Sequence, residues 1–276
     1  MKVFNEIVEV RKWRHKLGGS VGFVPTMGYL HDGHIELVRR AKSDNREVIV
    51  SIFVNPTQFG ADEDYATYPR DKENDESLLK AEKVDAVFMP DADEIYPVEP
   101  AAWVDVGDIG ERLEGASRPG HFRGVATVVA KLFNIVEPAR AYFGQKDAQQ
   151  LVVIRRMVAD LNMNVQVVAV PTVRELDGLA MSSRNVYLDP DDRDAAVVLY
   201  KALITALRLY EKGERNADVI RGEMPSLIRT EPRAAIDYVS VAHSDTLEEL
   251  AKIDDHALVS LAVQIGKTRL IDNISL

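Results

Sequence analysis

The sequence predicts a doubly wound α/β domain followed by a smaller α+β domain. Along the first 170 residues, short runs rich in Val, Ile and Phe alternate with longer segments of helical period. That alternation is typical of a parallel sheet covered by helices, and such sheets bind ligands beyond the carboxyl ends of their strands. The expected strands are 22–25, 48–54, 86–89, 141–143 and 165–170. The expected helices are 34–42, 74–83, 124–136 and 148–161.

The residue patterns at the two ends of the chain differ from this alternation. Residues 1–19 mix apolar and charged residues in a pattern that predicts an amphipathic helix. After Pro171 we expect a loop and a domain boundary near residue 172, which gives domains of residues 1–172 and 173–276. For the second domain the expected elements are helices 191–212 and 217–228 and strands 236–242 and 258–265.

Composition narrows the classes of function. The 276 residues carry 34 Lys and Arg against 44 Asp and Glu, for a formal net charge of −10, and the chain has no cysteine. An acidic balance argues against a nucleic-acid partner, because phosphate backbones are bound by a local excess of basic residues. No apolar run approaches the length that spans a bilayer, so we expect no membrane partner. The absence of cysteine suits a reducing compartment, and we expect the cytoplasm.

The sharpest motif is FVPTMGYLHDGH, residues 23–34, which leads from a strand through a turn into a helix. A helix N-terminus offers free N–H groups and a positive dipole end, and both favour phosphate. His31 and His34 are three residues apart, so both imidazoles can donate to one group of phosphate oxygens. Two other interpretations stay open at this point, a metal-binding pair or polar residues at a helix start. The chain has neither GxGxxG nor a P-loop motif.

A second motif is AYFGQKDAQQ, residues 141–150, also at a predicted strand-to-helix junction. Lys146 can neutralise phosphate charge, and Asp147 can hold a ribose hydroxyl, a cation or the helix start. Gln150 can both donate and accept, which suits recognition of a hydroxy acid. An ordinary helix cap with solvated neighbours is the alternative.

A third motif, ELDGLAMSSRN at residues 175–185, lies at the expected domain boundary. Ser182, Ser183 and Arg184 place two hydroxyl donors and a permanent cation on one loop, a combination suited to polyphosphate. Such a loop can also close over a nucleotide. An ordinary polar surface loop is the alternative.

Four further candidate residues come from three other segments. Asn55 and Gln58 in FVNPTQFG project from a predicted strand end, and Arg118 lies in RPGHFRG just before a predicted helix. The acidic residues 71–76 favour a helix N-terminus over a metal site. Asp75 of that segment is nevertheless a candidate to face bound Mg²⁺.

In this order and spacing, PTMGYLHDGH, FVNPTQFG, RPGHFRGV, YFGQKDAQQ and DGLAMSSRN closely resemble the pantothenate synthetase family (pantoate–β-alanine ligases). The resemblance covers residues 22–188. It implies a Rossmann-like fold of the HxGH nucleotidylyltransferase type, related to class I aminoacyl-tRNA synthetases, with the second domain closing over the ATP site. The implied reaction is the ATP-dependent, Mg²⁺-assisted condensation of (R)-pantoate with β-alanine to pantothenate. It passes through pantoyl adenylate, releases AMP and pyrophosphate, and is carried out by a cytoplasmic homodimer.

The resemblance also implies roles for individual residues. The implied catalytic residues are His34, the family's proton donor, with His31, Lys146 and Arg184. The implied ATP-binding residues are Met27, Gly28, Tyr29, Leu30, His31, Asp32, Gly33, His34, Gly144, Gln145, Lys146, Asp147, Val173, Met181, Ser182, Ser183 and Arg184. The implied pantoate- and β-alanine-binding residues are Gln58, Gln150, Asn55 and Arg118.

Two positions depart from the family pattern, Tyr29 in place of a small residue and Glu36 in place of serine. We expect Glu36 to turn outward, or else to weaken ATP binding. Two alternative functions stay open: another adenylyl or cytidylyl transferase, and a catalytically silent module that binds a nucleotide or a metal through His31 and His34.

Overall fold

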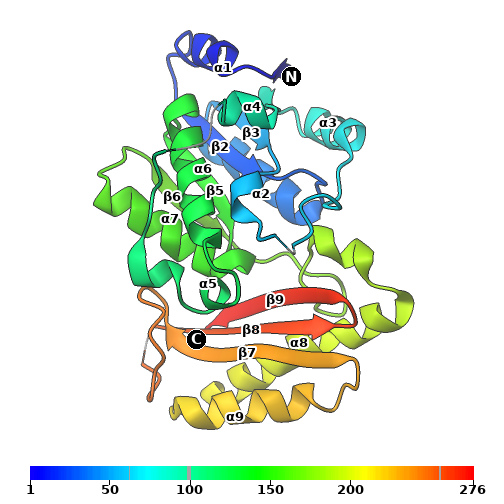
Figure 1. The fold of residues 1–276 in the computed structure, drawn as a ribbon. Helices are drawn as coiled ribbons and strands as arrows, with labels where there is room; N and C mark the ends of the chain where they lie inside the picture. The colour runs from blue at the N-terminus through cyan, green and yellow to red at the C-terminus, as the bar shows by residue number, and fades with distance from the viewer. Residues whose placement is uncertain (62, 98–100, 255) are drawn as a thin grey trace. The chain divides into compact units, whose positions relative to one another are not determined.

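The computed structural model describes every residue except 62, 98–100 and 255 (Figure 1). The chain forms two compact units. Unit 1 consists of Met1–Glu111, Gly115–Gly144 and Val153–Pro171. Unit 2 consists of Arg112–Glu114, Gln145–Val152 and Thr172–Leu276. Two short segments from earlier in the chain therefore belong to the unit built mainly from its last third.

Unit 1 contains a six-stranded sheet in the order β1-β4-β3-β2-β5-β6, and each neighbouring pair is parallel. Its strands are β1 (Lys2–Phe4), β2 (Val21–Thr26), β3 (Glu47–Ile52), β4 (Ala86–Phe88), β5 (Arg140–Gly144) and β6 (Gln166–Val170). The order reverses between β2 and β5, which makes this the switch point where doubly wound sheets bind ligands. The expected Rossmann-like parallel sheet is confirmed.

Both faces of this sheet are buried, which explains the nearly continuous apolar strands. On one face, Val24, Val50 and Val87 pack in a core with residues of α2 (Asp32–Asp44) and α3 (Lys72–Ala81). On the other face, Phe133 of α6 (His121–Val136) makes edge contacts with Phe23 and Phe143, with ring centroids 6.4 Å apart in each pair. The strands therefore place their carboxyl-end loops on a rigid support.

The amino terminus differs from the sequence prediction of one amphipathic helix. Residues 2–4 form β1, which pairs with β4, and the helix α1 covers only Ile7–Arg14. Glu6 caps this helix reciprocally with Glu9, so the helix begins after residue 6. The prediction was wrong for residues 2–4 because pairing with a buried strand overrides helical patterning.

Unit 2 combines the helices α8 (Pro190–Glu211) and α9 (Ala217–Ile228) with an antiparallel sheet in the order β7-β8-β9. The strands are β7 (Ala234–His243), β8 (Ala257–Ile265) and β9 (Thr268–Ser275). The small α+β fold is confirmed, but β9 was not predicted. A two-residue turn at Gly266 joins it to β8, and the polar residues Asp272 and Asn273 interrupt its apolar alternation.

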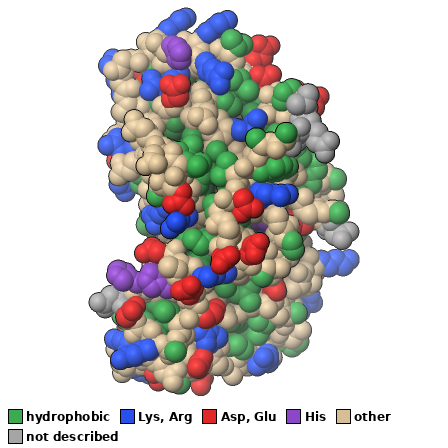
Figure 2. Space-filling model, turned by 60° about the vertical axis from the view of Figure 1, so that its left-hand side comes forward, with side chains coloured by type: hydrophobic (Ala, Val, Ile, Leu, Met, Phe, Trp, Pro, Cys, Tyr) green, Lys and Arg blue, Asp and Glu red, His purple; other side chains and the backbone are tan. Residues whose placement is uncertain are grey.

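The other elements are short, except for one helix that follows β5 and runs from unit 2 into unit 1. That helix is α7 (Ala148–Asp160). The short ones are η1 (Pro56–Gln58), α4 (Ala92–Ile95), η2 (Gly107–Gly110), α5 (Glu114–Ser117), η3 (Gln145–Asp147) and η4 (Ser183–Tyr187). Acidic and basic side chains are interspersed on the face drawn in Figure 2. None of the helices in the described part of the chain is long and apolar enough to span a membrane.

Candidate active site

Residues 27–34, called the histidine loop, join β2 to α2 and include the first residues of α2. The paired histidines of this segment cap the helix that they begin. His31 is the N-cap of α2, and the N–H of Gly33 donates to its Nδ1 at 3.1 Å. In return, the N–H of His31 lies 3.4 Å from Nδ1 of His34. The two imidazole ring centroids are 4.1 Å apart. This is a capping box in which histidines replace the usual Ser/Thr and Glu, so the pair stabilises the start of the helix.

The capping box determines which ring nitrogens can donate to a ligand. In neutral imidazole one nitrogen accepts and the other carries the proton. Because Nδ1 of both His31 and His34 faces a backbone N–H, the proton of each neutral ring is on Nε2. Both Nε2 atoms belong to residues at the N-terminus of α2, where the helix dipole is positive. Capping and anion binding are therefore compatible roles for the same side chains.

A buried carboxylate holds the first half of this loop. Asp75 of α3 is 1% exposed, and its two oxygens accept from the N–H groups of Tyr29 and Leu30 at 2.9 and 2.7 Å. Burial raises the pKa of Asp75, while these two hydrogen bonds act in the opposite direction. Tyr29 has a positive φ of 52°, which the carboxylate helps to stabilise. Asp71 caps α3, so the predicted helix N-terminus at residues 71–76 is confirmed.

The loop after β3 orients one side-chain amide. Gln58 in η1 is 9% exposed. Its Oε1 accepts from Nδ2 of Asn55 at 3.0 Å, and its Nε2 contacts the sulfur of Met27 at 3.2 Å. Asn55 is 1% exposed, and its Oδ1 accepts from Thr57 and Tyr96. The structure thus brings Gln58 next to the histidine loop through Met27, while Asn55 is fully engaged in holding Gln58.

Arg118 also lies beside Gln58. Its guanidinium forms an ion pair with Glu63 at 2.5 Å and contacts Nε2 of His121 at 3.1 Å, and Nδ1 of His121 lies 2.8 Å from the carbonyl of Gln58. Burial acts to raise the pKa of Glu63, but the hydrogen bonds and charge of Arg118 outweigh it and lower that pKa. Glu63 thus orients Arg118, and Arg118 and His121 stabilise the backbone at Gln58.

The candidate site residues at the end of β5 and after it lie in unit 2, except for Gly144, which lies in unit 1. Gly144 ends β5, and η3 follows with Lys146 and Asp147, whose charged groups are 3.6 Å apart. The side chain of Lys146 is 19% exposed. Gln150 is half-buried in the first turn of α7, one turn beyond Lys146. Lys146 and Asp147 therefore lie in the turn before Gln150, as the motif predicted.

The third motif forms a hairpin and a 3₁₀ turn in unit 2. The N–H of Met181 donates to the carbonyl of Val173 at 3.0 Å. Ser182 caps η4 by accepting from the N–H of Arg184 at 3.3 Å, and Ser183 is 7% exposed. Ser182 thus has a structural role at this turn, besides the role in phosphate binding that the composition predicts.

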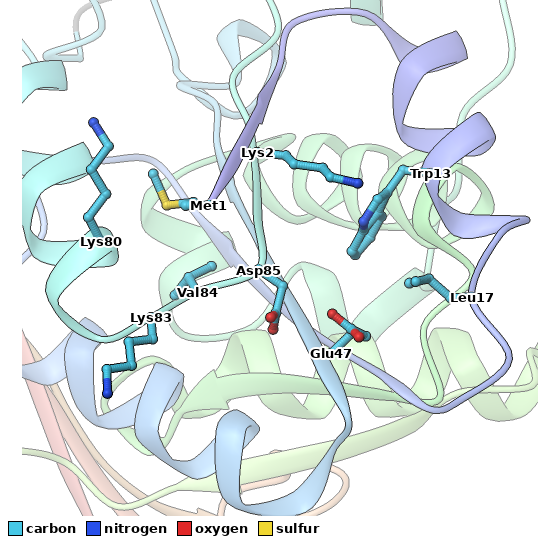
Figure 3. A pocket seen from close by; sticks show the side chains of 9 residues that line it. All are labelled: Met1, Lys2, Trp13, Leu17, Glu47, Lys80, Lys83, Val84 and Asp85. Atoms are coloured by element: carbon cyan, nitrogen blue, oxygen red, sulfur yellow. The ribbon is translucent and has the colours of Figure 1, made fainter.

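The described residues contain no group of three or more His, Asp or Glu side chains placed to hold a metal ion. A cavity of about 540 Å³ lies in unit 1 at the amino ends of β1, β3 and β4 (Figure 3). The carboxylates of Glu47 and Asp85 point into it near Trp13, and burial, followed by the charge of Asp85, raises the pKa of Glu47. No candidate residue lines this cavity. The cavity lies at the amino ends of the strands, whereas the histidine loop follows the carboxyl end of β2.

Sequence reasoning missed the residues that hold the candidates in place. It gave no role to Glu63 or Tyr96, and it did not predict the strand that carries Asp272 and Asn273. The sequence of this strand, TRLIDNIS, gives no clear signal, because Asp272 and Asn273 interrupt its alternation of apolar residues. Glu36 is exposed on α2, so the expectation that it turns outward is confirmed.

The chain is similar over its full length to curated and solved proteins. A family model described as pantoate–β-alanine ligase matches residues 2–275. Pantothenate synthetase of Roseiflexus sp. strain RS-1 is 59% identical over 273 residues, which are 99% of this chain and 98% of the relative. Pantothenate synthetase of Thermotoga petrophila is 53% identical over 276 residues, with 99% of each chain covered.

Two solved structures extend the similarity. Pantothenate synthetase from Thermus thermophilus is 48% identical and matches with a TM-score of 0.95 over 99% of each chain. A pantoate–β-alanine ligase from Francisella tularensis, complexed with beta-gamma ATP and β-alanine, is 37% identical. It matches with a TM-score of 0.82 over 100% of this chain and 97% of its own.

Proposed function

Since the chain belongs to the pantoate–β-alanine ligase family, we propose that it performs this ligation with the residues described above. The reaction is the ATP-dependent condensation of (R)-pantoate with β-alanine to pantothenate, through pantoyl adenylate, with release of AMP and pyrophosphate. The observation that carries the assignment of residues is the reciprocal histidine cap at the switch point of the sheet. A helix start with two further N–H donors suits a polyphosphate chain.

In the first step the carboxylate oxygen of pantoate attacks the α-phosphorus of ATP. The bond from the α-phosphorus to the bridging oxygen breaks, and pyrophosphate leaves with the electron pair. Negative charge grows on the departing phosphates, so groups that donate to those oxygens lower the barrier. We assign this role to the Nε2–H groups of His31 and His34. Neither imidazole has to give up its proton, because a hydrogen bond is sufficient to stabilise the charge.

We assign the remaining phosphate contacts to unit 2. Lys146 supplies a compact positive charge, and Ser182, Ser183 and Arg184 supply hydroxyl donors and a planar cation. Asp147 is assigned to a ribose hydroxyl. The other positions assigned to ATP are Met27, Gly28, Tyr29, Leu30, Asp32, Gly33, Gly144, Gln145, Val173 and Met181.

Pantoate is a hydroxy acid, and amide side chains recognise its hydroxyl groups by donating and accepting. We assign this recognition to Gln58 and Gln150, with Gln58 also next to β-alanine. Asn55 acts on pantoate through Gln58, since its own polar atoms are already bonded within the protein. Arg118 acts through the backbone of Gln58 by way of His121.

In the second step the amine of β-alanine attacks the acyl carbon of pantoyl adenylate. The new C–N bond forms, AMP leaves with the electrons of the broken C–O bond, and the nitrogen loses a proton to solvent. The enzyme's task in this step is to position the two reactants and to keep water from the anhydride.

Mg²⁺ is proposed to enter with the nucleotide, as MgATP. The acidic residues described here offer no dedicated set of metal ligands, and both oxygens of Asp75 accept backbone N–H groups. Mg²⁺ commonly binds through substrate phosphates and water with few protein ligands, and it would neutralise phosphate charge there. We further propose that the enzyme is a cytoplasmic homodimer, as expected from the family, and light scattering of the purified protein tests the dimer.

A substrate-omission assay tests the function. Pyrophosphate release should require MgATP and pantoate but not β-alanine, whereas AMP release and amide formation should require all three. Pyrophosphate release that responds to another acid and not to pantoate would contradict the assignment and favour a different nucleotidyl transferase. ATP binding without turnover under any combination would favour a silent binding module.

A further inference from the structure

Strand β9 carries two adjacent buried residues that hold η3 and the hairpin of residues 174–180 in unit 2. Asp272 is 2% exposed and Asn273 is 4% exposed. The amide Nδ2 of Asn273 donates to the carbonyl oxygens of Gln145 and Lys146, at 3.0 and 2.8 Å. Both hydrogens of this amide are therefore used to hold two successive peptide groups of η3.

Asp272 holds the other segment through an arginine. Its carboxylate accepts two hydrogen bonds from the guanidinium of Arg174, at 2.6 and 2.9 Å. The same guanidinium donates to the carbonyl of Gly178 at 3.0 Å and lies 4.7 Å from the ring centroid of Tyr200. Arg174 pairs with Ala180 in an antiparallel bridge. The hairpin of residues 174–180 is thus fixed immediately before Met181.

The two halves of this contact are linked to each other. The N–H of Asn273 donates to Oδ1 of Asp272 at 2.8 Å, and Arg174 reaches the carbonyl of Asn273 at 3.3 Å. A shift of either residue is therefore transmitted to the other. Charge-assisted, bidentate hydrogen bonds such as those between Arg174 and Asp272 determine orientation and also contribute stability.

We propose that Asp272 and Asn273 are positioning residues for adenylation, which place the phosphate-contacting groups of η3 and of the Met181–Arg184 loop in mutual register. This inference rests on the proposed function, because it takes Lys146 and Ser182–Arg184 as phosphate contacts. Asn273 acts through the backbone of Lys146 and touches no substrate. Asp272 acts through Arg174 on the hairpin that leads to Ser182.

The contact between Asn273 and η3 suits a positioning role because it fixes the backbone of Lys146. Lys146 can stabilise the departing phosphates only if its flexible stem begins at the correct point, and its carbonyl is one of the two that Asn273 holds. Misplacement of a catalytic group by about 1 Å can cost about 10²-fold in rate. A buried amide is sensitive to replacement because its donors face carbonyl oxygens.

The first test is the isosteric substitution Asn273→Asp. It removes the two donors and places carboxylate oxygens against the carbonyls of Gln145 and Lys146. We expect pantoate-dependent pyrophosphate release in a single turnover to slow by about 10- to 100-fold, with the KM for β-alanine unchanged. Asn216→Asp is the matched control, since Asn216 is an exposed N-cap and Asp caps equally well. This control should retain the wild-type rate.

A double-mutant cycle separates positioning from general destabilisation. We compare Asn273→Asp in the wild-type enzyme and in Lys146→Ala. If Asn273 acts through Lys146, the second substitution should change the rate of Lys146→Ala by less than about twofold, because coupled residues are not additive. Independent, multiplicative effects would overturn the inference, and so would an Asn273→Asp enzyme that is folded and fully active.

The same experiment distinguishes this inference from the proposed function. If Lys146→Ala keeps the wild-type rate, the role assigned to Lys146 is wrong, and the inference is overturned with it. If Lys146→Ala is slow and Asn273→Asp is fast, only the inference is overturned. If Asn273→Asp does not fold, Asn273→Ala, which adds no charge, takes its place in the cycle. Loss of folding in both would assign Asn273 to folding and overturn the positioning role.

A separate substitution tests the contact between Asp272 and Arg174. Asp272→Asn keeps the shape but removes one of the two acceptors of Arg174 and the charge between them. We expect slower adenylation here too, by about tenfold, and no further effect in an Arg184→Ala background. The matched control is Asp218→Asn, which weakens an exposed ion pair with Arg221 in the same unit.

Discussion

The candidate segments of the two units are held in different ways. In unit 1, the histidine loop is held largely by its own residues, through hydrogen bonds from backbone N–H groups to imidazole nitrogens two and three residues away. In unit 2, η3 and the hairpin before Met181 are held by β9, across 127 and 98 residues of sequence. The first arrangement forms together with its helix. The second requires that the end of the chain has folded.

Because the two segments are held differently, we expect substitutions in them to affect activity and stability differently. A locally capped loop keeps its geometry as long as the helix forms, so substitutions there should affect chemistry more than stability. Segments held by a distant strand should lose geometry and stability together. The predictions below test this contrast.

The largest effect is expected for His34→Ala. Loss of one Nε2–H donor from the phosphates should lower the rate of pantoyl-adenylate formation by about 10²- to 10³-fold. The fold should be retained, because the Nδ1 contact of His34 is long, at 3.4 Å. Single-turnover pyrophosphate release and circular dichroism are the measurements. An enzyme with the normal rate would remove this histidine from the mechanism.

His31 provides the control that separates capping from chemistry. His31→Asn keeps a good N-cap, whereas His31→Ala loses it at a cost of about 1 kcal/mol. Both should be slow in adenylation, but only the alanine variant should unfold at lower urea. Equal stability of the two variants would show that the cap contributes nothing.

The second prediction concerns the hairpin of unit 2. Gly178 has a φ of +97°, and a Cβ there would lie 1.9 Å from the ring of Tyr200. Gly178→Ala should therefore lower the free energy of unfolding by about 3 kcal/mol, from overpacking and backbone strain together. It should also slow adenylation, since the displaced hairpin leads into Met181.

Gly213 is the matched control for this substitution. It has the same φ of +97°, but a Cβ at this position would meet no atom within 4 Å. Gly213→Ala should cost only the strain of a left-handed residue, about 1 kcal/mol, with the adenylation rate unchanged. Equal urea midpoints for the two variants would contradict the packing argument.

The same contrast explains what the sequence could predict. The strands of unit 1 and the motif at His31 and His34 have local signatures, namely apolar periodicity and a strand-to-helix turn, and both were predicted. The support from Asn273 and Asp272 has no local signature, because it depends on which distant peptide groups the strand meets. Strand β9 was missed since these two buried polar residues break its alternation. Residues 2–4 were assigned to a helix because pairing with β4 cannot be inferred from their own pattern.

The third prediction examines the exception in unit 1, where a residue of α3 holds the histidine loop. Asp75→Asn replaces one acceptor by an amide donor, so the N–H of Tyr29 or Leu30 loses its partner. The lost bond is partly offset because a buried charge is also removed, and the net loss of stability should be about 1 kcal/mol. Adenylation should slow by about tenfold. Asp71→Asn, which preserves the cap of α3, should change neither quantity.

The smallest effect concerns the ion pair of Glu63 and Arg118, and it should depend on pH. The pKa of Glu63 is lowered below its ordinary value of 4.5, since Arg118 outweighs the opposing effect of burial. The stabilisation is therefore fully present above pH 4.5 and is lost as the pH falls through the lower pKa of the folded state. Near pH 7, Glu63→Gln should lower the free energy of unfolding by less than about 1 kcal/mol.

Urea unfolding as a function of pH measures this difference, which should shrink toward zero as the pH falls through the lowered pKa of Glu63 in the folded state. Glu82→Gln is the control, because Glu82 pairs with Arg39, whose side chain is 56% exposed. Such a pair should contribute almost nothing at any pH. If Glu63→Gln instead became more destabilising in acid, the carboxylate would have a raised pKa, and Arg118 would not be its main partner.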